Sequence, residues 1–277
     1  MRPEHCHNRP SLVPLMRLTV LTAAGFLAAA ALVKWLPGDQ VSAAAYAAAL
    51  TTLLAFGLPA WLTRKYSQDL KKSADLQVPR PNRLLAAALA ALVLQPALSY
   101  AADLTRSALE HLLSPDRFLD LMQLQTERTD MIRHIAGPGL WGRFPMAVLS
   151  LALLPALCEE LFFRATLQTL MRRFIRSAAG TVAAVSAIFT AVHSDWINAP
   201  GIFLCSVLLG YSYLWSGKLW IAVVFHATSN LWNLLSLYAP DCFAGFSPGW
   251  SAAAGLPLAV ALSRYAAGRP LVPRKRF

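Results

Sequence analysis

Charge is scarce in this chain of 277 residues. Only 14% of the residues are Asp, Glu, Lys or Arg, against about a quarter in a typical soluble domain. In contrast, 56% are hydrophobic, and the mean hydropathy is +0.47. The deficit of charge excludes an intrinsically disordered chain. The net charge of +11 does not indicate nucleic acid binding, because short basic clusters alternate with long apolar runs. This pattern predicts a multi-pass membrane protein whose partner is the lipid bilayer.

Cysteine is also sparse, and its placement excludes two kinds of small scaffold. The four cysteines form no CxxC pair, and Cys158 and Cys205 lie inside apolar runs, so neither a disulfide framework nor a zinc ribbon is predicted. His5, Cys6 and His7 offer metal ligands, but no second cluster completes a tetrahedral site. We therefore expect no resident cofactor.

Eight apolar runs approach the roughly 20 residues that cross a bilayer as a helix. They cover residues 18–36, 41–62, 84–104, 144–171, 178–196, 200–215, 219–238 and 250–265. The first run follows three arginines, as a signal peptide does, but its extension to Trp35 and the seven later runs favour an uncleaved anchor. No sequence repeat divides the chain. We predict an all-α, polytopic membrane bundle of about eight helices, forming a single integral domain over residues 1–277.

The basic residues predict the orientation of this bundle. If the N-terminus is cytoplasmic, most of the 25 Lys and Arg residues fall on the cytoplasmic side, in agreement with the positive-inside rule. Both termini are then cytoplasmic, and we expect a bacterial inner membrane. The 105–143 loop balances five arginines against five acidic residues and lies outside. Within it, residues 118–135 fit either a helix on the outer membrane surface or a solvated connector.

Charged residues interrupt the fourth run at Glu159, Glu160 and Arg164. A charged side chain near the middle of a bilayer costs about 2.5–3.5 kcal/mol, so each of the three requires an explanation. Glu160 and Arg164 are four residues apart, with the acid first, which favours an ion pair on one helical face. This salt bridge explains only one glutamate. Glu159 points about 100° away and has no partner in its own helix.

Two further runs carry histidine. His193 lies in the fifth run, and His226 lies in the seventh, on one helical face with Asn230 and Asn233. A single membrane histidine is more often a helix–helix hydrogen bond than a catalyst. However, a rise of about 1.5 Å per residue puts Glu160, His193 and His226 roughly 12–22 Å from the cytoplasmic helix ends. All can therefore converge in one site shielded from lipid.

The chemistry of these groups is that of a hydrolase. A carboxylate beside an imidazole can hold a water molecule and accept its proton. A second imidazole and an amide can stabilise the oxyanion that forms when a peptide carbonyl is attacked. No Gly-x-Ser-x-Gly or His-Glu-x-x-His motif competes with this interpretation.

The three segments resemble the CAAX prenyl protease 2 and bacteriocin-processing family of glutamic-type intramembrane proteases. Its motifs, Glu-Glu-x-x-x-Arg, Phe-x-x-x-His and His-x-x-x-Asn/Asp, match here in order: Glu159-Glu160 with Arg164, Phe189 with His193, and His226 with Asn230. The resemblance covers about residues 144–238, the protease-like core, and leaves the spans before residue 144 without a signature.

This resemblance implies a role for each residue. Glu159 would activate water with the help of His193, Glu160 and Arg164 would support the electrostatics, and His226 with Asn230 would stabilise the oxyanion. It also implies a helical bundle around a conical cavity. We expect the substrate to be a membrane-associated protein or peptide rather than a prenylated one. A C-terminal sorting signal is one candidate.

Three alternatives stay open from the sequence. The two glutamates and two histidines could bind zinc and make a zinc-dependent membrane protease. Intramembrane Glu and His are also typical of proton-coupled transporters. Finally, a non-catalytic immunity or scaffold protein could retain the same fold.

Overall fold

All regular secondary structure in the described part of the chain is helical. The computed structural model describes residues 11–36, 40–68, 70, 75–136, 143–238 and 248–269. The helices are α1 (Val13–Val33), α2 (Gln40–Thr52), α3 (Leu58–Lys65), α5 (Pro81–Leu112), α6 (Pro115–Ala136), α7 (Phe144–Ala147), α8 (Leu154–Glu160), α9 (Thr169–Met171), α10 (Ala178–His193), α11 (Ala199–Ser216), α12 (Leu219–Tyr238) and α14 (Pro248–Ala266). The predicted all-α class is confirmed.

Three π-helical segments join some of these helices into longer rods. Segment η1 (Leu53–Gly57) connects α2 to α3, whereas η2 (Val148–Leu153) and η3 (Leu161–Gln168) lie on either side of α8. Residues 144–171 therefore form one continuous rod. Five helical stretches are long and apolar enough to cross a membrane: 13–33, 43–65, 81–112, 144–171 and 199–216. Each of the eight predicted runs overlaps a helix, while the count of eight membrane spans stays a prediction.

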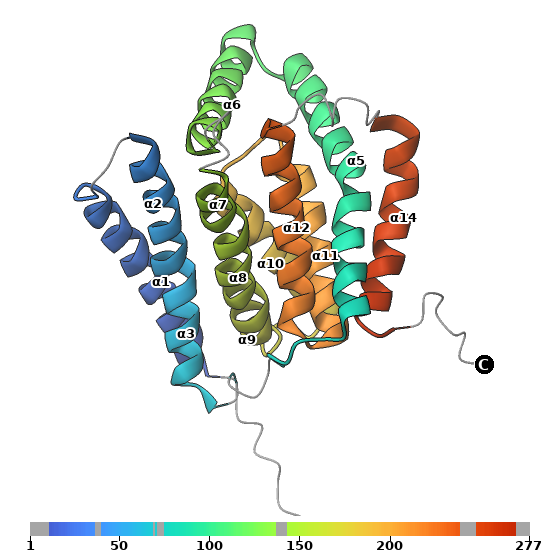
Figure 1. Cartoon of the computed structure of the whole chain (residues 1–277). Coiled ribbons are helices and arrows are strands. Elements are labelled where there is room, and N and C mark those ends of the chain that lie inside the picture. The colour runs from blue at the N-terminus through green and yellow to red at the C-terminus, as the bar shows by residue number, and fades with distance from the viewer. Residues whose placement is uncertain are drawn as a thin grey trace, which may run out of the picture.

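The bundle packs around two apolar clusters (Figure 1). One joins α5, α11, α12 and α14, and the other joins α1, η1 and α3 to the 144–171 rod and α10. Small residues allow close backbone approach. A Cβ added at Gly25 would lie 1.9 Å from the Leu54 carbonyl oxygen, and one at Gly255 would lie 2.3 Å from that of Val93. Such small-residue contacts are typical of membrane helices, which pack without a hydrophobic driving force between them.

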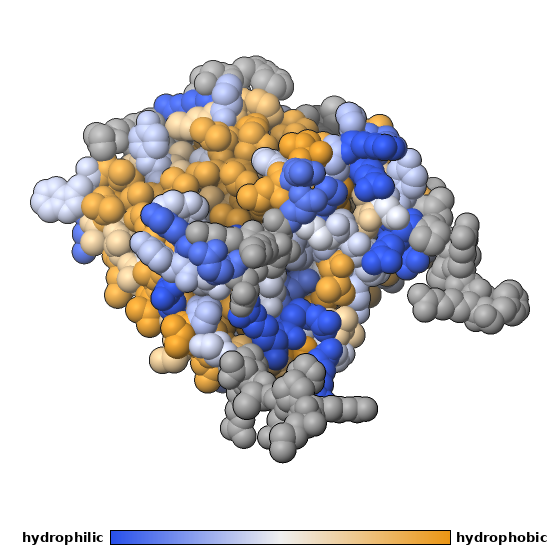
Figure 2. All heavy atoms as spheres, turned by 90° about the horizontal axis from the view of Figure 1, so that it is seen from below, coloured by the Kyte–Doolittle hydropathy of each residue, from blue (hydrophilic) through white to orange (hydrophobic). Residues whose placement is uncertain are grey.

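Helix ends carrying basic residues gather on one face of the bundle, which we call the basic face. It contains the start of α1 and α5, the ends of α3, α9 and α14, and the turn between α11 and α12 (Figure 1). Its described basic residues are Arg17, Arg64, Lys65, Arg80, Arg83, Arg172, Arg173, Arg176, Lys218, Arg264 and Arg269. Figure 2 looks onto this face and shows groups of hydrophilic side chains among apolar ones. Helix α6 covers the opposite face.

A short clip connects two loops on the basic face. The Asp75 N–H donates to the Gly217 carbonyl (3.1 Å), the Leu219 N–H donates to the Asp75 carbonyl (3.3 Å), and Lys218 Nζ lies 2.6 Å from Asp75 Oδ2. Trp220 Nε1 also donates to the Leu76 carbonyl at 2.9 Å. The hydrogen bond from Lys218, followed by that from the Gln77 N–H, holds the pKa of the Asp75 carboxyl below its usual value. The clip therefore ties the loop before α5 to the start of α12.

The clip predicts a specific pH dependence. Because the pKa of Asp75 is lower in the folded chain than in the unfolded chain, its stabilising effect is complete above the unfolded value. The effect disappears as the pH falls through the folded value. We expect Asp75→Asn to lower the thermal unfolding temperature in detergent near neutral pH and to match the wild type in acid. A difference that persists unchanged in acid would contradict an ionic role.

Candidate active site

Glu160 and Arg164 form a completely buried ion pair on the 144–171 rod. Arg164 Nε donates to Glu160 Oε2 at 3.0 Å, and both side chains have zero exposure, so the predicted salt bridge is confirmed. Arg164 Nη2 also donates to Ser206 Oγ on α11 at 3.1 Å. The Arg164 guanidinium lies 5.1 Å from the centre of the Phe189 ring on α10. This one pair thus connects three membrane helices.

The second oxygen of Glu160 orients His226. Glu160 Oε1 lies 2.9 Å from His226 Nδ1, and because a carboxylate accepts hydrogen bonds, the proton belongs on Nδ1. His193 is held in the same manner by its own helix, since its Nδ1 lies 2.7 Å from the Phe189 carbonyl oxygen. In both rings, the Nδ1 atom therefore has a hydrogen-bond partner, and the Nε2 atom is available to bind a water molecule or a substrate.

Both free imidazole nitrogens point to Glu159. Glu159 Oε2 lies 4.0 Å from His193 Nε2 and 4.0 Å from His226 Nε2. This oxygen is buried, and among the described residues it has no hydrogen-bond partner. The predicted convergence of the acids and imidazoles is thus seen in the distances. A separation of 4.0 Å is too long for a direct hydrogen bond but suits groups that share one water molecule.

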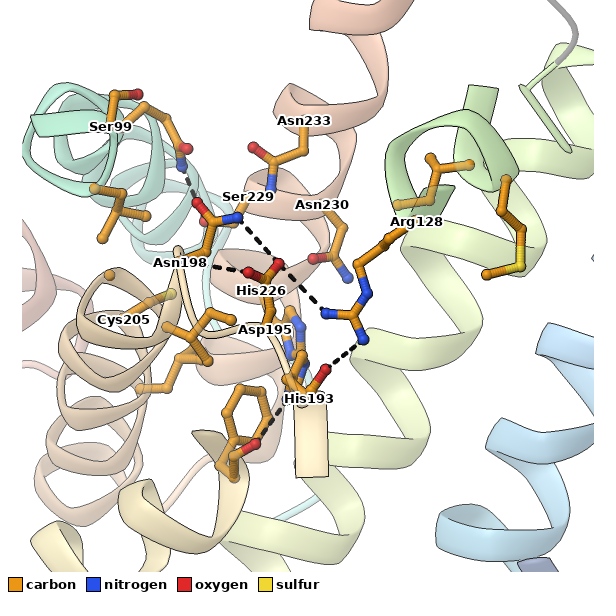
Figure 3. Close-up of a pocket in the computed structure, with 18 residues that line it drawn as sticks. Ser99, Arg128, His193, Asp195, Asn198, Cys205, His226, Ser229, Asn230 and Asn233 are labelled. Atoms are coloured by element: carbon orange, nitrogen blue, oxygen red, sulfur yellow. Dashed lines mark hydrogen bonds and ion pairs between the residues drawn. The ribbon is translucent and has the colours of Figure 1, made fainter. Parts of the chain in front are cut away.

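The two histidines border a cavity of about 480 Å³. His226, Asn230 and Asn233 lie on one face of α12 toward this cavity (Figure 3). Asn230 is therefore within the predicted site, one turn beyond His226. Glu159, Glu160 and Arg164 are not part of the cavity lining. Glu159 lies beside the two imidazoles, and the ion pair lies deeper in the bundle.

Helix α6 supplies a site residue that sequence reasoning missed. Arg128 Nη2 donates to the His193 carbonyl at 2.6 Å, and Nη1 lies 3.4 Å from Asp195 Oδ2 (Figure 3). Asp195 in turn accepts hydrogen bonds from the backbone and side-chain nitrogens of Asn198 at 3.1 and 3.0 Å. Of the two alternatives left open for residues 118–135, the structure has the helix, α6. Its apolar Ile132, which also borders the cavity, was the available sign that one face packs against the bundle.

Ser194 explains why His193 stands at a helix end. Ser194 has φ 51°, in the left-handed region, and so ends α10 immediately after His193.

The cavity wall formed by α5 and α12 contains a further polar contact that the sequence did not indicate. Gln95 Nε2 of α5 donates to Ser229 Oγ of α12 at 3.1 Å. Among the described residues, no group of three or more His, Cys, Asp or Glu side chains is arranged as a metal site.

Substitution of the two adjacent glutamates is predicted to affect stability to very different extents. Glu160→Gln would leave the Arg164 charge buried without its counter-charge, a change that costs about 3–5 kcal/mol. We expect a large fall in unfolding temperature for this variant, measured on purified protein in detergent. Glu159→Gln removes no hydrogen bond to the described residues at the buried Oε2 and should unfold close to the wild type. Equal losses in the two variants would contradict this assignment.

Comparison with known proteins agrees with the site. Residues 141–232 match the model of one family, described as type II CAAX prenyl endopeptidase Rce1-like. No curated protein and no solved structure matches. The matched segment contains all three motifs and the five polar residues around Glu159. The predicted resemblance to the CAAX prenyl protease family is thereby confirmed over residues 141–232, and the chain is an integral membrane protein.

Proposed function

We propose that the protein is a glutamic-type intramembrane endopeptidase that uses Glu159 to activate a water molecule. The observation that carries this proposal is the position of Glu159 Oε2, buried and 4.0 Å from the Nε2 atoms of both His193 and His226. The family match supports protease activity. The matched family is one of endopeptidases, and a buried carboxylate next to two imidazoles is the group that such a reaction needs.

The hydrogen bonds around the imidazoles support a first chemical step in which Glu159 and His193 hold the water molecule. His193 donates its Nδ1 proton to the Phe189 carbonyl, so a neutral ring presents Nε2 as an acceptor. A water molecule can then donate one hydrogen to His193 Nε2 and the other to Glu159 Oε2, which leaves an oxygen lone pair for the peptide carbonyl. As this C–O bond forms, Glu159 accepts the proton, and later it delivers that proton to the leaving amine.

His226 and Asn230 suit the stabilisation of the oxyanion. His226 already donates its Nδ1 proton to Glu160, so it donates from Nε2 only as an imidazolium. Glu160 Oε1 lies 2.9 Å from the Nδ1 atom of this ring, and Glu160 Oε2 is bonded to Arg164. Asn230 adds an amide donor one turn along α12, on the wall of the same cavity.

A zinc ion would need the same atoms. Tetrahedral zinc with ligands at about 2.0–2.1 Å requires ligand atoms roughly 3.3 Å apart, closer than the 4.0 Å between Glu159 Oε2 and each Nε2. The other nearby carboxylate, Glu160, is not free to bind zinc, because its two oxygens are already bonded to Arg164 and His226. We therefore propose hydrolysis without a resident metal. Cleavage by purified protein that survives dialysis against a chelator supports this, and loss of cleavage restored by zinc contradicts it.

The decisive variant is Glu159→Gln. The amide cannot accept the proton of the water, so we expect cleavage to fall by at least about 10²-fold, the lower range for loss of general base catalysis. Membrane-protein termini are compared by proteomics between cells with the wild type and cells with the variant, and a fragment found only with the wild type is then tested with purified enzyme. The control is Glu110→Gln, an exposed position near the end of α5.

The transporter and the scaffold alternatives each predict a different result for Glu159→Gln compared with its control, Glu110→Gln. Solute transport that continues in Glu159→Gln would indicate a transporter, and cellular activity that is indifferent to the change would indicate a scaffold or immunity protein. Either result overturns the proposal, and full cleavage by the purified Glu159→Gln variant overturns the role of Glu159.

Arg128 is proposed as a positioning residue for His193. Because Arg128 fixes the His193 carbonyl and Asp195, we expect Arg128→Gln to lower kcat by up to about 10²-fold with a smaller change in KM. Arg128→Lys, which can keep one of the two contacts, should recover part of the loss. The control is Arg133→Gln on the exposed side of α6, where Arg133 pairs only with Asp130 among its described contacts. Equal kcat values for the two Gln variants would contradict the positioning role.

A further inference from the structure

The cavity lies on the α6 side of the bundle. Helices α10 and α11 meet at residues 194–198, beside the cavity, while α5 and α12 continue beyond this level (Figure 1). The 32 residues of α5 extend about 48 Å, more than the roughly 30 Å of the hydrocarbon layer. Its last part carries exposed Asp103, Arg106 and Glu110, so it projects out of the membrane. Helix α6 then returns toward the bundle and brings Arg128, Met131 and Ile132 to the cavity.

Charge assigns the other side of the bundle to the cytoplasm. The basic face contains the helix ends with Lys and Arg, and Asp75 there is already paired with Lys218. On the α6 side, acidic and basic residues are mixed along α6 itself, for example Asp130 beside Arg133. Positive charge is retained on the cytoplasmic side of membrane proteins. The cavity and the catalytic groups therefore face the extracytoplasmic side.

The cavity lining suits a peptide. It presents four amide side chains, Gln95, Asn198, Asn230 and Asn233, together with the hydroxyls of Ser99 and Ser229. Amides and hydroxyls both donate and accept hydrogen bonds, as the groups of an extended peptide backbone require. Gln95 already bonds Ser229, and Asn198 bonds Asp195, so Ser99, Asn230 and Asn233 are the groups best placed to bond a peptide, whereas a prenyl chain has no hydrogen-bonding groups to offer them.

We propose that this cavity receives, from the extracytoplasmic side, the extended segment next to the membrane anchor of another membrane protein, and that the chain cuts it there. The proposal rests on the proposed function for hydrolysis, but its direction of access rests on the fold and on the distribution of charge between the two sides of the bundle. The substrate class is thus an anchored protein with its cleavage site outside the cytoplasm.

Access is tested by cysteine labelling, with no need for activity. Ser99→Cys and Met131→Cys place a thiol at the cavity, where Met131 is 55% exposed, and Arg80→Cys places one on the basic face. The four native cysteines are first changed to alanine. If that protein fails to fold, the native cysteines are kept, and the labelling of the unmodified wild type is subtracted from the labelling of each variant. A membrane-impermeant maleimide on intact cells should label the first two variants but label Arg80→Cys only after the membrane is opened. The reverse pattern overturns the proposal and leaves the hydrolytic mechanism intact.

The substrate class is tested with a single-span reporter that carries the segment cut by the wild type. Two versions place this segment on opposite sides of the membrane, and each is expressed with the wild type and with Glu159→Gln. We expect cleavage only of the extracytoplasmic version and only by the wild type. Cleavage confined to the cytoplasmic version, or dependence on a prenyl group, overturns this inference. Cleavage of the correct version by Glu159→Gln instead overturns the proposed function.

Discussion

A fully buried charge pair in a low-dielectric bundle organises the rest of this site. Neither Glu160 nor Arg164 has any exposed side chain, so each charge must be neutralised inside the protein. The pair meets this requirement with contacts that leave its own helix. Arg164 bonds Ser206 and packs on Phe189, and Glu160 bonds His226. Once the pair forms, α10, α11 and α12 can adopt few relative positions around the 144–171 rod.

The two neighbouring glutamates differ because their surroundings differ. Both oxygens of Glu160 form hydrogen bonds, one with Arg164 and one with His226. Glu159, one residue earlier, has a buried oxygen with no hydrogen-bond partner among the described residues. A buried carboxylate oxygen without a hydrogen bond is costly in a folded interior, and the proposed mechanism explains this one by a water molecule bound there. The same rod therefore combines a structural acid, Glu160, and the acid for which a catalytic role is proposed, Glu159.

The helices before the family-like segment support this rod from behind. Gly57 of η1 faces Cys158, the residue before Glu159, and a Cβ at Gly57 would lie 2.9 Å from Cys158 Sγ. From α3, Arg64 Nη1 donates to the Ala165 carbonyl at 2.7 Å, where η3 interrupts the regular helical hydrogen bonds. Thr166 Oγ1 similarly donates to the Leu161 carbonyl, five residues earlier. The spans without a recognisable motif thus help to fix the position of the glutamates.

The sequence by itself determined the helical class, the apolar runs, the basic face and the three polar motifs, because these follow from composition and from spacing within single helices. It also determined that Glu160 pairs with Arg164, since a separation of four residues puts both on one face. Only the tertiary structure decided that Nε2 of His226 remains free, because the partner of its Nδ1, Glu160, lies on another helix 66 residues away. The contact of Arg128 with the His193 carbonyl, across 65 residues, was also decided there. The sequence likewise did not predict the π-helical segments or the position of the cavity under α6. They depend on contacts between distant helices, which no local pattern encodes.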